Sequence, residues 1–240
     1  MTITTVGFDA DDTLWHSESH FAVTEDKFRS LLQPWLAPDA VADLLLARER
    51  ANLEIFGYGA KGFTLSMIET ALEVSDGSLP PSAIQQIIDW GKDICCHPVE
   101  LLDGVFDTVT SLQGHYRLML ITKGDLFHQE SKVAESGLAD HFDHVEILSE
   151  KSPQSYQAVL DRVGVGCEEF VMVGNSVRSD ILPVVEIGAQ AIHLPYGITW
   201  GHELVDVPSH EVRWVELNRM HDVPGAVHRL GSRLRSAKSA

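Results

Sequence analysis

The sequence predicts an α/β fold: a Rossmann-like parallel sheet core with an inserted all-helical cap domain. Three observations predict it. Short apolar runs that end in polar or glycine residues recur along the chain. Helical patterns separate these runs in the second half of the sequence. The interval 10–116, between the first run and the second, is far too long for a single crossover connection and is mostly helical in pattern.

The apolar runs have the length and composition of buried strands, and the polar or glycine residues after them mark where each strand stops. The helical pattern at 153–163 starts with Ser152 as N-cap and Pro153 in the first turn. Strands that alternate with helices of this length predict a parallel sheet with right-handed crossovers. The predicted strands are 3–9, 117–122, 145–149, 170–174 and 191–194, with a weaker one at 212–217, and the helices between them are 129–137, 153–163 and 179–188.

The long first interval predicts a second domain. Its pattern predicts helices at 20–36, 39–56, 64–73 and 81–95, separated by proline- or glycine-containing breaks. We therefore expect a core domain made of residues 1–16 and 100–240 and a helical cap domain made of residues 17–99. An insertion at this point of a parallel sheet is expected over the carboxyl ends of the strands, where open α/β sheets bind ligands. It would then serve as a lid that excludes water and chooses the substrate.

Composition excludes several classes of function. The 240 residues are 44% hydrophobic and 22% charged, which is ordinary for a globular protein. The net charge is 18 − 35 = −17, so neither nucleic acid nor an anionic membrane surface is an expected partner. The three cysteines are typical of a reducing compartment, and no secretory signal or membrane-spanning run is visible. We expect a cytoplasmic protein; the sequence gives no indication of its oligomeric state.

The densest chemical signal is the sequence Asp9-Ala10-Asp11-Asp12-Thr13, directly after the apolar run 6–8. Asp9 lies at the carboxyl end of that strand, and Asp11 can reach the same side. Two carboxylates at this spacing can have different chemical roles: one can be the nucleophile and a metal ligand, and the other can be the general acid and base. The alternative is a helix N-cap followed by solvated acids, because aspartate-rich turns are common.

Three further polar groups follow later strands in chain order. Thr122 ends the second strand, where its hydroxyl can hold a phosphate oxygen, and Lys151 follows the third strand, where it can neutralise a carboxylate and a phosphoryl group together. Asn175 and Asp180 follow the fourth strand as oxygen ligands for a hard cation. Each of these residues alone also fits an ordinary turn, a surface lysine or a helix N-terminus.

Taken together, these residues resemble the four motifs of the haloacid dehalogenase-like hydrolase superfamily, in order, in strand-end position and in the helical insertion after the first motif. The resemblance covers nearly the whole chain. The first motif is similar to that of the phosphatase branch, because haloacid dehalogenases and the phosphonatase branch lack the second aspartate, here Asp11. The sequence departs from the pattern at Asn175, where many members have aspartate, and at Lys123, where asparagine is frequent.

The resemblance implies a Mg²⁺-dependent phosphatase that hydrolyses a small phosphorylated metabolite through an aspartyl-phosphate. Asp9 would attack phosphorus, and Asp11 would act as acid and base. Thr122 and Lys151 would hold the transferring group, and Mg²⁺ would bind Asp9, the Asp11 carbonyl and the fourth motif, Asn175 and Asp180. Two alternatives stay open. One is a phosphomutase or phosphotransferase on the same scaffold; the other is a non-catalytic binding module with a weakened metal site.

A glycine motif in the helical insertion points to a different chemistry. Residues 57–62 match G-x-G-x-x-G, but a helical pattern rather than a strand precedes them, so a dinucleotide site is not expected. We interpret the segment as a cap loop in which Tyr58 and Lys61 contact the substrate. The alternative is a simple break between helices. No P-loop and no G-x-S-x-G serine-hydrolase motif occurs in the sequence.

Overall fold

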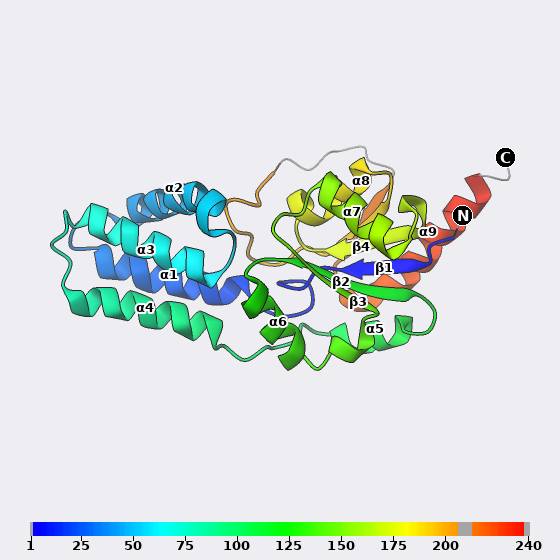
Figure 1. The fold of residues 1–240 in the computed structure, drawn as a ribbon, viewed down its shortest axis with the longest axis horizontal. Helices are drawn as coiled ribbons and strands as arrows, with labels where there is room; N and C mark the ends of the chain where they lie inside the picture. Colours follow the sequence, from blue (N-terminus) through cyan, green and yellow to red (C-terminus); the bar gives the residue numbers. More distant parts are fainter. Residues whose placement is uncertain (1, 206–212, 238–240) are drawn as a thin grey trace. The chain divides into compact units, whose positions relative to one another are not determined.

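The computed structural model describes residues 2–205 and 213–237, which divide into two compact units. Among the described residues, the first unit contains 2–16, 99–123, 131–205 and 213–237, and the second contains 17–98 and 124–130. No helix in the described part of the chain has the length and apolar character needed to cross a bilayer. Figure 1 shows the sheet with its helices and the group of helices α1 to α4.

The first unit is built on a six-stranded sheet in the order β3-β2-β1-β4-β5-β6, in which every neighbouring pair is parallel. The predicted Rossmann-like α/β core is therefore confirmed. The predicted strand 212–217 is represented by β6, and its Val212 lies outside the described residues. The strands are β1 (Thr5–Phe8), β2 (Arg117–Lys123), β3 (His144–Leu148), β4 (Phe170–Gly174), β5 (Gln190–His193) and β6 (Trp214–Glu216).

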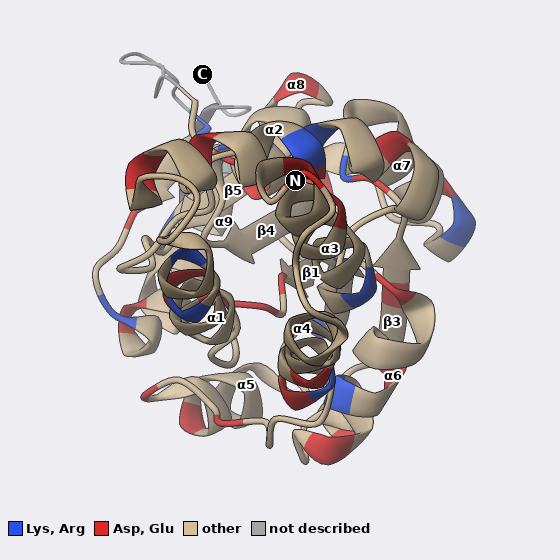
Figure 2. Cartoon of the chain, turned by 90° about the vertical axis from the view of Figure 1, so that its left-hand side faces the viewer, with Lys and Arg blue, Asp and Glu red and all other residues tan. Residues whose placement is uncertain are grey.

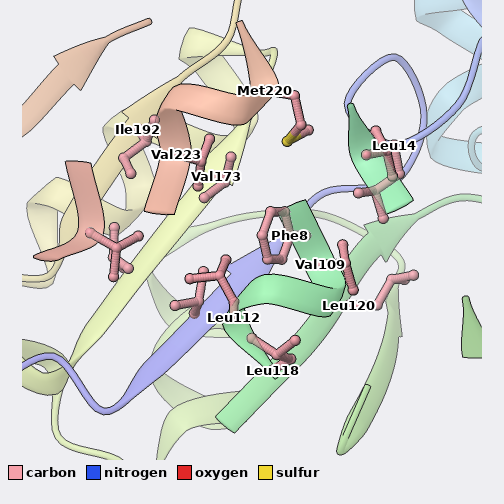
Figure 3. Packing of buried hydrophobic residues seen from close by; sticks show 14 of the residues in the cluster. Phe8, Leu14, Val109, Leu112, Leu118, Leu120, Val173, Ile192, Met220 and Val223 are labelled. Carbon is pink, nitrogen blue, oxygen red and sulfur yellow. The ribbon is translucent and has the colours of Figure 1, made fainter. Parts of the chain in front are cut away.

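Helices cover both faces of this sheet. Side chains alternate along β2, so that Leu118 and Leu120 enter one apolar cluster while Met119 and Ile121 enter the other. The first cluster is completed by α5 and α9, and Figure 3 shows Phe8 of β1 at its centre. The second is completed by α7 and α8. The helices of this unit are α5 (Val105–Leu112), α6 (Leu126–Glu135, whose first turn belongs to the second unit), α7 (Pro153–Val163), α8 (Leu182–Glu186) and α9 (Val223–Ala237).

The second unit is a group of four helices with its own apolar core. The core is built from one face of each helix, for example Phe28 of α1, Leu45 of α2, Met67 of α3 and Ile87 of α4, all at most 1% exposed. The helices are α1 (Glu18–Leu32), α2 (Pro38–Phe56), α3 (Ala60–Val74) and α4 (Pro81–Cys95).

Helix α3 begins four residues earlier than the pattern 64–73 predicts, so residues 60–62 of the glycine motif are helical rather than a loop. Gly59, with φ of 114°, occupies the N-cap, and Ala60 and Lys61 form the first turn. Gly62 is required by space, because a Cβ there would lie 2.9 Å from the carbonyl oxygen of Gly57. The glycines therefore allow a tight helix start, and the interpretation of Lys61 as a loop residue was wrong.

The negative charge is distributed over the surface. Figure 2 shows acidic positions on several helices, among them α5, α6 and α8. Because the net charge is −17, binding of an anionic ligand requires positively charged side chains close to the binding site. In the first unit, lysine side chains can provide this charge.

Candidate active site

The predicted site residues of the first unit lie at the carboxyl edge of the sheet. Because β1 pairs with β2 on one side and β4 on the other, the chain leaves three adjacent parallel strands at the same edge. Asp9 follows β1, and its backbone N–H donates to the carbonyl oxygen of Val173 at 2.9 Å. Thr122 lies near the end of β2 and is 1% exposed. Asn175 directly follows β4.

A buried lysine links two of the predicted carboxylates. Lys151 Nζ lies 2.5 Å from Asp9 Oδ1 and 2.7 Å from Asp180 Oδ1, and the Lys151 and Asp180 side chains are each 1% exposed. Lys151 is fixed by its place in the chain, because the next residue, Ser152, is the N-cap of α7 in a capping box with Ser155. The sequence predicted that Lys151 neutralises one carboxylate. In the structure, Lys151 contacts two carboxylates, those of Asp9 and Asp180.

Burial and charge act against each other in this triad. Burial lowers the pKa of Lys151, but the carboxylates of Asp180 and Asp9 outweigh burial and raise that pKa well above its usual value. Burial and the neighbouring charge of Asp180 raise the pKa of Asp9 to about 7, against the opposing effect of Lys151. One ammonium group thus serves two buried carboxylates, and the triad has an excess of negative charge that a bound cation would relieve.

The loop after β4 brings Asp180 back to the strand end. The chain forms a π-helical turn at Val177–Ile181, and Asp180 Oδ2 accepts a hydrogen bond from the Ser176 backbone N–H at 3.0 Å. Gly174 is needed for this approach, because a Cβ there would lie 2.3 Å from the Asp180 carboxyl group. Since both Asp180 oxygens have protein partners, Asp180 holds Lys151 and the loop in place.

Asn175 faces the oxygen atoms that the sequence assigned to a metal. With its amide nitrogen turned toward them, Asn175 donates to Asp9 Oδ2 at 3.1 Å and to the Asp11 carbonyl oxygen and Thr13 Oγ1 at 3.2 Å each. Thr13 Oγ1 in turn donates to Asp9 Oδ2 at 3.2 Å. One carboxylate oxygen, one carbonyl oxygen and one amide therefore converge, and with the amide oxygen turned inward they form the hard donor set that Mg²⁺ prefers.

This donor set fits Mg²⁺ without a cluster of carboxylates. No group of three or more His, Cys, Asp or Glu side chains suited to a metal occurs among the described residues. The set instead depends on a backbone carbonyl and an amide beside the single Asp9 carboxylate. Its negative charge is accordingly low, as the asparagine in the fourth motif implies.

The Asp11 carboxylate contacts two side chains, Trp15 and Lys132, that sequence analysis did not identify as its partners. Its Oδ1 accepts a hydrogen bond from Trp15 Nε1 at 2.7 Å, and Lys132 Nζ lies 2.6 and 2.8 Å from its two carboxylate oxygens. The Asp11 side chain is 28% exposed, against 9% for Asp9. The two aspartates therefore have different surroundings, which is the condition for two chemical roles.

The predicted substrate residues Tyr58 and Lys61 lie in the second unit. Lys61 Nζ lies 2.9 Å from both carboxylate oxygens of Asp125 and 5.8 Å from the ring centre of Phe127, whereas Tyr58 is half-buried. Hydrogen bonding to Lys61 lowers the pKa of Asp125. The structure thus gives Lys61 a partner within its own unit, and a role toward a substrate stays a prediction for both residues.

Comparison with known proteins identifies the family of the chain. The family model of the haloacid dehalogenase-like hydrolases matches residues 3–188, so the chain belongs to this family of hydrolases. A crystal structure of a haloacid dehalogenase-like family hydrolase from Xanthomonas campestris is 44% identical, with a TM-score of 0.87, and the match covers 97% of this chain and 93% of that one.

Two curated relatives match over shorter segments. A glyceraldehyde 3-phosphate phosphatase from Pyrococcus abyssi is 30% identical over 87 residues, which is 34% of this chain and 37% of that protein. An N-acylneuraminate-9-phosphatase from Mus musculus is 30% identical over 96 residues, 38% of this chain and 39% of that protein. The chain thus spans less than two fifths of the length of either relative.

Proposed function

We propose that the protein is a Mg²⁺-dependent phosphatase that hydrolyses the phosphate monoester of a small metabolite through an aspartyl-phosphate. The observation that carries the proposal is the pair of aspartates with different partners. Asp9 is buried against Lys151, and Asp11 is more exposed and held by Lys132 and Trp15. The two curated relatives named above are phosphatases of small phosphorylated molecules, which supports the same class of substrate.

In the proposed reaction, the Asp9 carboxylate attacks phosphorus, and the bond between phosphorus and the leaving oxygen breaks. Asp11 donates a proton to the leaving oxygen and then removes one from the water that hydrolyses the aspartyl-phosphate. Lys151 holds Asp9 in one orientation and supplies a positive charge beside the phosphoryl oxygens, and the Thr122 hydroxyl holds one of those oxygens.

Asp9, the Asp11 carbonyl and Asn175 would hold Mg²⁺. Asp180 would support the site indirectly, because it holds Lys151 and the loop after β4 in place. When bound, the ion would neutralise charge on the phosphoryl group and help to orient it. The raised pKa of Asp9, about 7, indicates that the ionised nucleophile needs more positive charge than Lys151 provides. A phosphate monoester brings further negative charge, which makes this need greater.

The second aspartate favours phosphate esters over haloacids. Displacement of a halide by Asp9 requires no protonation of the leaving group, whereas the departure of an alkoxide does, and Asp11 is held beside the nucleophile for that task. Phosphoryl transfer to an acceptor other than water uses the same groups, so a phosphotransferase is an alternative outcome of the same chemistry.

The experiment is to incubate the purified protein with para-nitrophenyl phosphate, with and without Mg²⁺, and in parallel with 2-chloropropionate. We expect Mg²⁺-dependent release of inorganic phosphate and no release of chloride. A screen of phosphorylated metabolites with phosphate detection then identifies the substrate. Chloride release without phosphate release would contradict the proposal, and so would the absence of both.

A further inference from the structure

A second polar network lies beside the active site and is not part of the chemistry proposed above. It consists of Lys123, Ser176, Ser179 and Glu203, and we refer to it as the Glu203 network. Glu203 Oε1 lies 2.6 Å from Lys123 Nζ. Glu203 Oε2 accepts hydrogen bonds from Ser176 Oγ at 2.5 Å and from Ser179 Oγ at 2.7 Å. Lys123 Nζ also donates to Ser179 Oγ at 2.8 Å.

The network is well shielded from water. The side chains of Glu203 and Lys123 are 11% and 15% exposed, and both serines are buried. Burial raises the pKa of Glu203, but Lys123 and the two hydroxyls outweigh burial and lower that pKa to about 2. A paired and hydrogen-bonded charge in such surroundings holds its partners more firmly than a surface ion pair does.

Each partner of Glu203 is the chain neighbour of a proposed active-site residue. Lys123 follows Thr122, Ser176 follows Asn175, and Ser179 precedes Asp180. Ser176 also connects the network to the site, because its hydroxyl accepts a hydrogen bond from the Ser179 N–H at 3.0 Å and its own N–H donates to Asp180.

Glu203 itself comes from a different part of the chain. It lies in the segment that follows β5, and its carboxylate joins that segment to the ends of β2 and β4. The network therefore also explains Lys123, which departs from the asparagine frequent at this position in the motif. Its ammonium group reaches Glu203 and Ser179.

We propose that Glu203 is a positioning residue for the metal site: its carboxylate holds the loop after β4 so that Asn175 and Asp180 are preorganised. The inference rests on the proposed function, because it assigns Mg²⁺ to Asn175 and its neighbours. A loop fixed in advance reduces the ordering of Asn175 that metal binding would otherwise require.

The test is to titrate Mg²⁺ into the protein by isothermal titration calorimetry, without substrate, for the wild type, Glu203→Ala and Glu146→Ala. Glu146 is a matched control, because its side chain is 19% exposed and forms an ion pair with Arg162 in the same unit. We expect Glu203→Ala to raise the Kd for Mg²⁺ about tenfold and Glu146→Ala to leave it within twofold of the wild type. Equal Kd values for the wild type and Glu203→Ala would overturn the proposal, as would equal increases in both variants.

Ser179→Ala provides a second variant if Glu203→Ala does not fold. It removes one hydrogen bond to Glu203 and one from Lys123 but keeps the ion pair, and we expect a rise in the Kd for Mg²⁺ of about threefold. An unchanged Kd in a folded Ser179→Ala protein would then overturn the proposal. A wild type that binds Mg²⁺ more tightly than Glu203→Ala but releases no phosphate would support the positioning role and contradict the phosphatase.

Discussion

Gly174→Ala is expected to disrupt the candidate active site by displacing the Asp180 side chain, although the substitution replaces no charged residue. A Cβ on residue 174 would lie 2.3 Å from both Cγ and Oδ2 of Asp180 and 2.5 Å from its Cβ. These distances are far below van der Waals contact, so Asp180 has to move, and its 2.7 Å contact with Lys151 and its hydrogen bond from Ser176 are lost or distorted.

The magnitude follows from two costs. Overpacking a well-filled interior costs about 1–3 kcal/mol, and separating one partner from a buried ion pair costs about 3–5 kcal/mol. The two costs overlap, because the movement that relieves the clash is the movement that breaks the pair. We therefore expect Gly174→Ala to lower the free energy of unfolding by roughly 3–5 kcal/mol and to reduce kcat for para-nitrophenyl phosphate at least a hundredfold.

Urea unfolding and steady-state kinetics measure both effects, with Gly197→Ala as the control. No atom lies within 4 Å of a Cβ built at Gly197, and its φ is outside the left-handed region. The control is expected to change the free energy of unfolding by less than about 0.5 kcal/mol and to keep wild-type activity. The reasoning is refuted if Gly174→Ala differs from the wild type no more than Gly197→Ala does.

Three further predictions concern the charges around the site. Asn175→Asp adds a carboxylate to the proposed donor set and should lower the Mg²⁺ concentration for half-maximal activity about tenfold, or about 1.4 kcal/mol; an unchanged value in a Mg²⁺ titration would contradict contact with the metal. Lys132→Met leaves Asp11 without its ion pair and should lower kcat about tenfold while KM changes little, whereas a change in KM alone would assign Lys132 to binding. The pKa of Glu203, lowered from 4.5 to about 2, gives stability that is present above pH 4.5 and lost as pH falls toward 2. In urea unfolding, the stability advantage of the wild type over Glu203→Gln should therefore decrease below pH 4.5 by roughly 1 kcal/mol per pH unit, and an advantage independent of pH would contradict the ion pair.

Most of the sheet could be predicted from the sequence, because a strand buried on both faces requires a nearly continuous apolar run. The runs at 117–122 and 170–174 correspond to β2 and β4 nearly residue for residue. Helix α5 was not predicted, since its eight residues span too few turns to give a clear period. The early start of α3 was missed because its glycines were interpreted as a loop, whereas close packing against Gly57 requires one of them.

The candidate site was predictable only where its residues follow strands. Parallel strands end at one edge of the sheet, so Asp9, Lys151 and Asp180 could be expected together before any contact was known. Thr13 was also within reach of sequence reasoning, since it lies four residues after Asp9 and shares its motif.

Lys132 and Glu203 could not be found in this way. Lys132 lies 121 positions from Asp11 in the chain, and Glu203 lies 80 from Lys123. One lies on a helix face and the other in a segment without regular structure, and neither belongs to a recurring motif. Their roles depend on tertiary contacts between side chains, which local sequence patterns do not encode.

Phosphoryl transfer to Asp9 is tested most directly by trapping the covalent intermediate. The wild type, Asp11→Asn and Asp9→Asn are mixed with para-nitrophenyl phosphate and Mg²⁺, quenched in acid and digested, and the peptides are examined by mass spectrometry. We predict a phosphate group on Asp9 in the wild type and a larger amount in Asp11→Asn, because the base that removes it is missing. Asp9→Asn should carry no phosphate and show no turnover. Wild-type-like turnover in Asp9→Asn, or phosphate on another residue, would contradict the assignment of Asp9 as the nucleophile.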